Sequence, residues 1–340
     1  MDGLIIITSL ITCLISLIIF RPLAIKFKLV DYPSERKKHT GNIPLIGGIS
    51  VFFGLLISYL FFIEFDMFLN VLLITALFIL IHGIWDDYAN LKAQTKILFQ
   101  VFLSAIVIYF TDVKIETLGN IFGVSYPLEL GLLSFPITII SVIALTNAIN
   151  MMDGLDGLAS GIVLIAITGL IFFNKTPEFS SIIYILLAIA SALLPFITLN
   201  MVTNLKFKVF LGDGGSLFLG YTISWALIFS AKNVDNFTPV FSLWCVAIPL
   251  FDFFCVIIMR LVKKQSIIKA RRDHIHHFLE NLGFSRKSIL LLIVSSGLAM
   301  LLLGSFIEKN FPSISFPAYL ILFLCYLFTR MYNKIKDTET

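Results

Sequence analysis

The chain has 340 residues, of which 58% are hydrophobic and 14% are charged, and its mean hydropathy is +0.97. Soluble domains usually carry roughly 25% charged residues, so this composition excludes a soluble globule and indicates a membrane protein with several spans. The formal net charge is only +4, and we expect no nucleic-acid partner.

Apolar runs along the chain predict an all-α, polytopic integral membrane protein. We expect about eleven transmembrane helices, with ten as the alternative, because several runs are short for a hydrocarbon core of roughly 30 Å. The first run has no basic stretch before it, so we expect a retained helix rather than a signal peptide. The runs cover residues 3–20, 45–63, 68–85, 97–111, 132–149, 158–173, 180–200, 217–231, 240–259, 288–306 and 314–329.

The basic residues predict the orientation of these helices. Of the 25 Lys and Arg residues, 21 fall in one set of alternate segments, and the positive-inside rule places that set in the cytoplasm. The set consists of the loops 21–44, 86–96, 150–157, 201–216 and 260–287 and the tail 330–340. We therefore expect a single domain, 1–340, with its N-terminus outside and its C-terminus in the cytoplasm. Residues 112–131 form the one long outer loop, and we expect a hairpin there.

The five cytoplasmic loops between helices also carry most of the unusual polar residues. In chain order these are Lys38 and His39; Asp86 and Asp87 in "GIWDDYANL"; Asn150, Asp153 and Asp156 in "NAINMMDGLDGLASG"; Asn200 and Asp213 in "LNMVTNLKFKVFLGDGGS"; and Arg272, His274, His276 and His277 in "RRDHIHH". Charged groups near a membrane core are costly and usually functional. Five loops that supply one face therefore predict a site at the cytoplasmic surface.

The residue types at this face favour phosphoryl transfer. Carboxylates and carboxamides offer the oxygen ligands that Mg²⁺ prefers, usually together with phosphates and water. Glycines beside the acids let the backbone approach a phosphate or adopt positive φ. Basic residues at the rim neutralise phosphate oxygens. A lipid phosphate would lie at this depth naturally, with its chain in the bilayer.

Each motif also has an ordinary structural interpretation. The Asp86–Asp87 pair can be a solvated helix end, the glycine motifs can be turns, and "HIHH" can be a surface patch. Histidines alone are poor Mg²⁺ ligands, so we expect these to bind phosphate or handle protons. We expect His82 to be a packed helix histidine. Asp252 is expected to hydrogen-bond inside the bundle or to pair with basic residues near the cytoplasmic end of its helix.

These segments together resemble the polyprenyl-phosphate N-acetylhexosamine-1-phosphate transferases, the family of MraY, TagO and WecA. The matching segments occur in family order over residues 31–290, and the "HIHH" loop and the eleventh helix resemble the WecA branch more than MraY. The segments are "HTGNIPLIGGIS", "GIWDDYANL", "TNAINMMDGLDGLASG", "LPFITLNMVTNLKFKVFLGDGGSLFLGY", "IPLFDFF" and "RRDHIHHFLENLGFS".

The resemblance implies a reaction between UDP-GlcNAc and undecaprenyl phosphate at the cytoplasmic face of the bacterial inner membrane. The lipid phosphate attacks the β-phosphorus, UMP leaves and undecaprenyl-diphosphate-GlcNAc forms, which starts a surface glycan such as O-antigen or common antigen. The implied cofactor is Mg²⁺, with Mn²⁺ as the alternative. Another UDP-N-acetylhexosamine remains an alternative donor, and a homodimer is left open.

The resemblance also assigns roles to individual residues. Asp86, beside Asp87, would deprotonate the lipid phosphate, and Asp156 and His276 are counted with them as catalytic. Asp213 would bind the metal with Asn150 and Asp153. The nucleotide and diphosphate would contact Asn200, Asp156, Arg272, His274, His276, His277, Lys38 and His39.

Functions of other classes fit the sequence less well. An ion-coupled transporter would place charges near the membrane midplane, whereas these acids lie at predicted helix ends. A di-metal oxygenase would need several histidine clusters, and the chain has five histidines with one cluster. The spaced aspartates of CDP-alcohol phosphotransferases are absent from the sequence.

Overall fold

The computed structural model describes residues 1–32, 41–119, 121, 126–173, 180–202, 204–234, 237–267 and 271–339, with the side chains of 180 and 333–339 outside the description. These residues are mainly helical, which confirms the all-α class. The elements are α1 (Asp2–Lys26), β1 (Val30–Asp31), β2 (Ile43–Pro44), α2 (Gly47–Phe62), α3 (Met67–Ala89), α4 (Ala93–Thr111), η1 (Gly131–Leu133), α5 (Ser134–Met152), α6 (Leu158–Phe173), α7 (Ser180–Met201), α8 (Gly212–Asn233), α9 (Pro239–Cys245), α10 (Ala247–Val262), α11 (Ile275–Asn281), α12 (Arg286–Asn310) and α13 (Pro312–Glu339).

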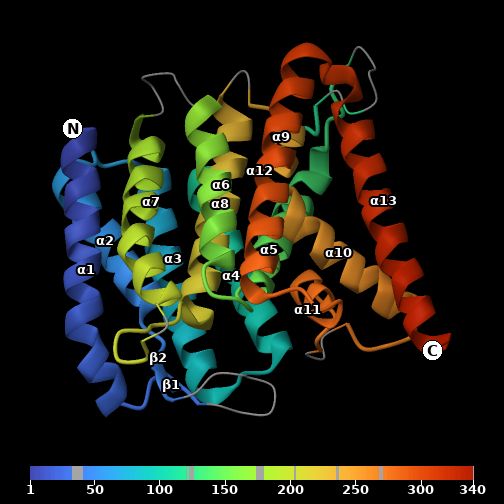
Figure 1. Ribbon diagram of the computed structural model, residues 1–340. Coiled ribbons are helices and arrows are strands. Elements are labelled where there is room, and N and C mark those ends of the chain that lie inside the picture. The colour runs from blue at the N-terminus through green and yellow to red at the C-terminus, as the bar shows by residue number, and fades with distance from the viewer. Residues whose placement is uncertain are drawn as a thin grey trace.

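Within the described ranges, eight helices are long and apolar enough to cross a membrane, and a ninth span forms if α9 and α10 are counted as one. The shorter apolar helices α2 and α6 coincide with two more of the predicted runs. The polytopic architecture is therefore confirmed, whereas the count of eleven stays a prediction. The N- and C-termini lie at opposite ends of the bundle, which agrees with an odd number of crossings (Figure 1).

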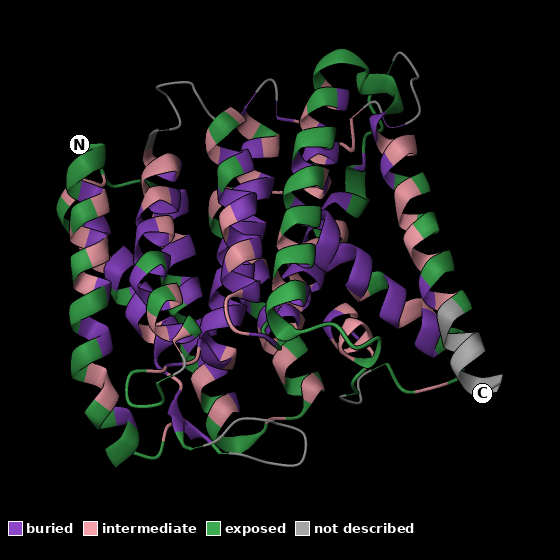
Figure 2. Ribbon diagram, viewed as in Figure 1, coloured by how far each residue is buried: buried purple, intermediate pink, exposed green. Residues whose placement is uncertain are grey.

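Helix α8 forms the centre of the bundle. It is buried along almost its whole length, whereas α1, α12 and α13 keep wide exposed faces (Figure 2). Its first turn packs against α3 at Gly83 and Gly214, where a Cβ on Gly83 would lie 2.4 Å from the Cα of Gly214. Small residues permit such close packing of membrane helices. Gly214 therefore has a packing role and Gly212 of the same motif has a positive φ of 77°, as one of the two predicted roles requires, while room for a phosphate stays a prediction.

The predicted run 240–259 is not one helix, and here the sequence-based prediction was wrong. Helices α9 and α10 meet at an angle of 87° around Val246. Pro249 explains the break, because its ring would clash with the carbonyl of Cys245 in a continuous helix and it cannot donate the hydrogen bond to that carbonyl. After the bend, α10 slants across the bundle toward the end of α13 (Figure 1).

Several predicted site residues lie inside helices rather than in the loops where we predicted them. Asp86 and Asp87 belong to the last turn of α3, Asp213 belongs to the first turn of α8, and the segment 260–287 contains the short helix α11. The apolar pattern could not place these ends, because the helices continue beyond the membrane-like stretch into polar residues.

The segment 112–131, which was predicted to be an outer loop, forms the expected hairpin in its described part. The amide of Leu118 donates to the carbonyl of Leu128, and the amide of Leu128 donates to the carbonyl of Gly119, both over 3.0 Å. At the other end of the bundle, β1 and β2 form a short antiparallel pair that the all-α prediction did not include.

Candidate active site

Asp87 ties the end of α3 to the beginning of α8. Its Oδ1 accepts a hydrogen bond from the amide of Asp213 (3.0 Å), and its Oδ2 accepts one from the amide of Gly214 (3.3 Å). The first amides of a helix have no partner within that helix, and α8 has no capping side chain of its own at Leu211. Asp87 therefore caps α8 from a neighbouring helix and fixes the position of Asp213.

Asp86 is almost fully buried, with 3% of its surface exposed. One carboxylate oxygen accepts from the amide of Leu91 (2.8 Å), and the other lies 2.5 Å from the Nζ of Lys96 on α4. A buried carboxylate is tolerated when it is paired in this way. The two adjacent acids of "DD" thus have different partners, a cation for Asp86 and backbone amides for Asp87.

Asn150 of α5 connects Asp213 to the third of the segments predicted to be cytoplasmic. The Nδ2 of Asn150 donates to the Oδ1 of Asp213 (3.0 Å) and to the Oγ of Ser216 (2.8 Å). The carboxyl group of Asp86 is also a neighbour of Asp213. Residues of α3, α5 and α8 that are far apart in sequence therefore meet at one point, as predicted from their shared side of the membrane.

The loop between α5 and α6 carries Asp153 and Asp156. Asp153 keeps an exposed side, but burial of its carboxyl group, followed by the like charges of Asp213, Asp87 and Asp156, raises its pKa well above its usual value. Asp156 instead lies 2.5 Å from the Nζ of Lys208. Asp156 therefore already has a cationic partner, which comes from the segment before α8.

Asn200 connects the loop between α5 and α6 to the segment before α8. It is buried, its Oδ1 accepts from the amide of Gly157 (2.7 Å), and its Nδ2 donates to the carbonyl of Val209 (2.9 Å). Gly157 has a φ of +77°, a backbone conformation that residues other than glycine rarely adopt. Its amide donates to Asn200 from this conformation. Contact of Asn200 with uridine stays a prediction.

The histidines of "HIHH" face several different partners. The Nδ1 of His274 lies 2.7 Å from Asp252 of α10, and the Nδ1 of His277 lies 3.3 Å from Glu280. Arg272 reaches the same Glu280 over 2.9 Å. The hydrogen bond of Asp252 confirms the structural role predicted for that residue.

His276 packs directly on the loop that carries Asp153 and Asp156. A Cβ on Gly154 would lie 2.2 Å from the Nε2 of His276, so only glycine fits beneath this ring. Burial, followed by the positive potential of His277 and His274, lowers the pKa of His276 to about 3. At neutral pH the imidazole is therefore neutral and can act through hydrogen bonds rather than through charge. Its Nδ1 is buried with no hydrogen-bond partner among the described residues.

Sequence reasoning missed the cations that balance these acids. Lys96 was counted only for topology, and Lys208 was placed among the polar residues of its loop without a partner, although both lie in the same predicted loops as the acids. Arg330 of α13 was missed because nothing in its sequence context connects the C-terminal helix with "HIHH". The predicted binding residues Lys38 and His39 lie outside the described residues.

The oxygen-rich residues suit a hard cation, although they do not form a complete protein cage. Asp213 and Asn150 touch, Asp86 lies near Asp213, and Asp153 lies close enough to the other acids that their like charges add to the effect of burial on its pKa. In the described ranges, no three His, Cys, Asp or Glu side chains converge into a ready metal site. This donor set matches Mg²⁺, which typically takes one or two carboxylates and completes its shell with water and substrate phosphates.

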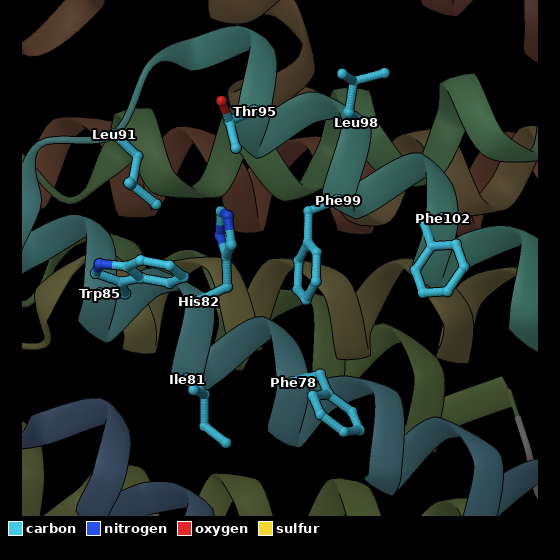
Figure 3. A pocket seen from close by; sticks show the side chains of 9 residues that line it. All are labelled: Phe78, Ile81, His82, Trp85, Leu91, Thr95, Leu98, Phe99 and Phe102. Atoms are coloured by element: carbon cyan, nitrogen blue, oxygen red, sulfur yellow. The ribbon is translucent and has the colours of Figure 1, made fainter.

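An apolar groove runs along the outer side of α3 and α4, one helical turn from Asp86. It has a volume of about 480 Å³, and the ring of His82 stands in it between Trp85 and Phe99 (Figure 3). His82 is buried and stacks on Phe99 with ring centroids 4.5 Å apart, which confirms the predicted packed histidine. The lining residues are Phe78, Ile81, His82, Trp85, Leu91, Thr95, Leu98, Phe99 and Phe102.

Comparison with known proteins agrees with this arrangement. Residues 69–231 match the model of glycosyl transferase family 4. The chain is 31% identical over 292 residues to an undecaprenyl-phosphate alpha-N-acetylglucosaminyl 1-phosphate transferase of Escherichia coli K12, which covers 85% of this chain and 79% of that protein. The corresponding protein of Yersinia pestis is 31% identical over 86% of this chain and 80% of its own length. A probable undecaprenyl-phosphate N-acetylglucosaminyl 1-phosphate transferase of Bacillus subtilis is 35% identical over the same shares.

Proposed function

Because the chain belongs to glycosyl transferase family 4, together with the undecaprenyl-phosphate N-acetylglucosaminyl 1-phosphate transferases, we propose that it catalyses the reaction in their name. It transfers GlcNAc-1-phosphate from UDP-GlcNAc to undecaprenyl phosphate, and UMP is released. The observation that carries this proposal is the meeting of Asp87, Asn150 and Asp213 from three different helices beside the buried Asp86.

The proposed site would lower the repulsion between two anionic phosphates. We assign Asp213 and Asn150 as metal ligands, with Asp153 as a further oxygen donor. When bound, Mg²⁺ supplies positive charge that offsets phosphate repulsion and stabilises the departing UMP. Arg272 and the histidines at 274, 276 and 277 are assigned to the diphosphate. Asp86 is assigned to accept a proton from the lipid phosphate, whose second pKa lies near neutrality.

The position of Asp86 supports its assignment to the acceptor lipid. Leu91 and Thr95 line the groove of Figure 3, and both neighbour the Asp86–Lys96 pair, because the amide of Leu91 donates to Asp86 and Thr95 precedes Lys96 in the chain. An isoprenoid chain in this groove would bring its phosphate to the same end of α3. Lys96 would then face the phosphate with a positive charge that already lies within the site.

The site is proposed to face the cytoplasm of a bacterial inner membrane, because the segments that carry it hold most of the Lys and Arg residues. GlcNAc is the proposed sugar because the relatives carry it in their names. The product would start a cell-surface glycan, since a polyprenyl diphosphate sugar is a membrane-held primer for further glycosyl transfer.

UMP release from the purified protein tests the proposed function. We expect UMP and a lipid-linked amino sugar when UDP-GlcNAc, undecaprenyl phosphate and Mg²⁺ are all present, and neither product when one of them is withheld. A panel with UDP-GalNAc and UDP-glucose measures the sugar preference. No UMP from the folded protein with all three components would refute the proposal.

A further inference from the structure

Asp252 of α10 is a fully buried carboxylate that lies outside the cluster around Asp213. It accepts four hydrogen bonds, from the Nδ1 of His274 (2.7 Å), the amide of Ile275 (2.8 Å), the hydroxyl of Tyr326 (3.0 Å) and the guanidinium of Arg330 (3.3 Å). A buried carboxylate needs such partners to remain charged. Asp252 therefore joins the "HIHH" segment to the last helix of the chain.

Arg330 holds the same segment by two further contacts. It donates to the backbone carbonyl of Asp273 over 2.6 Å, and its guanidinium lies 4.7 Å from the ring centroid of Phe278. The second contact is a cation–π interaction, which strengthens when the cation is removed from water, and Arg330 is only 5% exposed. One side chain of α13 thus contacts both Asp273, two residues before α11, and Phe278 in the middle of α11.

The carboxylate of Asp273 has its own anchor on α10. Arg260 donates to it through Nε (3.0 Å) and Nη2 (2.8 Å), the paired geometry that arginine forms with carboxylates. Three successive residues are therefore anchored. Asp273 is held through its backbone carbonyl, His274 through its side chain and Ile275 through its backbone amide.

This anchoring determines how His274 can meet a ligand. Since a carboxylate only accepts, the Nδ1 of His274 carries the proton, and Nε2 is left as the remaining ligand atom. The ring of His274 is nearly parallel to that of His276, at an interplanar angle of 9°, and His276 rests on Gly154. A continuous series of contacts thus runs from α13 to the loop of Asp153 and Asp156.

We propose that Arg330 and Tyr326 are positioning residues of the transferase, which hold the His274 imidazole for the diphosphate through Asp252. The inference rests on the proposed function, in which the histidines bind the diphosphate of the sugar nucleotide. It makes the last helix part of the donor site, although α13 carries none of the residues assigned to substrate.

The variant Arg330→Met tests this proposal. We expect the KM for UDP-GlcNAc to rise about tenfold, the lower end of the range for mutating an outer group that orients a metal-ligating histidine. The KM for undecaprenyl phosphate should change by less than about twofold, because its site lies at the α3 side. In a His274→Gln background the same substitution should add little, since residues that act through one another are not additive. Lys309→Met serves as the control, because it removes one positive charge in the last turn of α12, at the end of that helix far from α11.

Tyr326→Phe removes only the hydroxyl group that donates to Asp252, and it tests the same positioning role if Arg330→Met does not fold. A folded variant with the wild-type KM for UDP-GlcNAc, or equal effects with and without His274, would overturn the proposal. Hydrogen exchange at Ile275 separates this inference from the proposed function. Exchange should be faster in Arg330→Met even if the wild type releases no UMP, whereas unchanged exchange would refute the anchor itself.

Discussion

At the residue scale, the adjacent acids of "DD" have separate tasks. Asp87 bonds two backbone amides of α8, and Asp86 pairs with Lys96. The sequence predicted that both acids belong to the site, because they follow an apolar run on the basic side of the membrane. It could not predict the division of roles, since this depends on how the start of α8 meets the end of α3.

Asp213 and Asp87 should therefore respond differently to substitution. Asp213→Asn keeps an oxygen for the amide of Asn150 but loses the charge, so we expect most activity to be lost while thermal stability in detergent stays near wild type. Asp87→Ala leaves the first amides of α8 without a partner, which typically costs about 1–2 kcal/mol, so both stability and activity should fall. UMP release and thermal unfolding measure the two effects.

Asp87→Asn is the matched control for the cap. Its amide oxygen can still accept one of the two backbone hydrogen bonds, so its melting temperature should lie between those of the wild type and Asp87→Ala. Full activity in Asp213→Asn would contradict the metal assignment, and unchanged stability in Asp87→Ala would contradict the capping role.

At the element scale, the apolar runs predicted where helices occur better than where they bend or end. Each of the eleven runs overlaps a helix. However, the run 240–259 breaks at Val246, and α3 extends beyond the end of its own run, 68–85, to Ala89. Hydropathy reports contact with lipid, whereas the bend follows from Pro249 and the helix ends follow from tertiary hydrogen bonds. The groove between α3 and α4 likewise depends on packing that no single run contains.

The groove yields a prediction for the acceptor lipid. Leu98 lines it and is 68% exposed, so Leu98→Trp should fill space without disturbing the core. If the indole displaces about 50 Å² of apolar contact, the loss at roughly 25 cal/mol per Å² is ~1.3 kcal/mol, or a KM for undecaprenyl phosphate raised roughly tenfold. The KM for geranyl phosphate, whose chain is too short to follow the groove, should stay the same in kinetic assays of UMP release.

Leu291→Trp is the control for this substitution. Leu291 lies on α12 and is 71% exposed, so the variant adds the same ring to another outward-facing surface. Equal effects of the two variants, or equal effects on long and short acceptors, would show that the isoprenoid chain binds elsewhere.

At the scale of the whole molecule, the sequence predicted which loops work together, because the positive-inside rule assigns them to one side before any contact is known. The hydrogen bonds of Asp87, Asn150 and Asn200 then join the second, third and fourth of the segments predicted to be cytoplasmic. The link from α13 to "HIHH" was not predictable in this way, since Arg330 lies in a helix whose sequence shows only hydropathy and charge.

The same reasoning fixes the expected orientation of the molecule in its membrane. Helix α11 and the pair β1–β2 lie at the end of the bundle where the chain terminates, and α1 begins at the other end (Figure 1). Because 21 of the 25 Lys and Arg residues belong to the segments assigned to the first end, moving them across the membrane would be strongly unfavourable. A reporter fused after Thr340 should therefore read cytoplasmic, and one inserted after Glu116 in the hairpin should read external. Two signals from the same side would contradict an odd number of crossings, and a reversed pair would place the acids where a cytoplasmic sugar nucleotide cannot reach them.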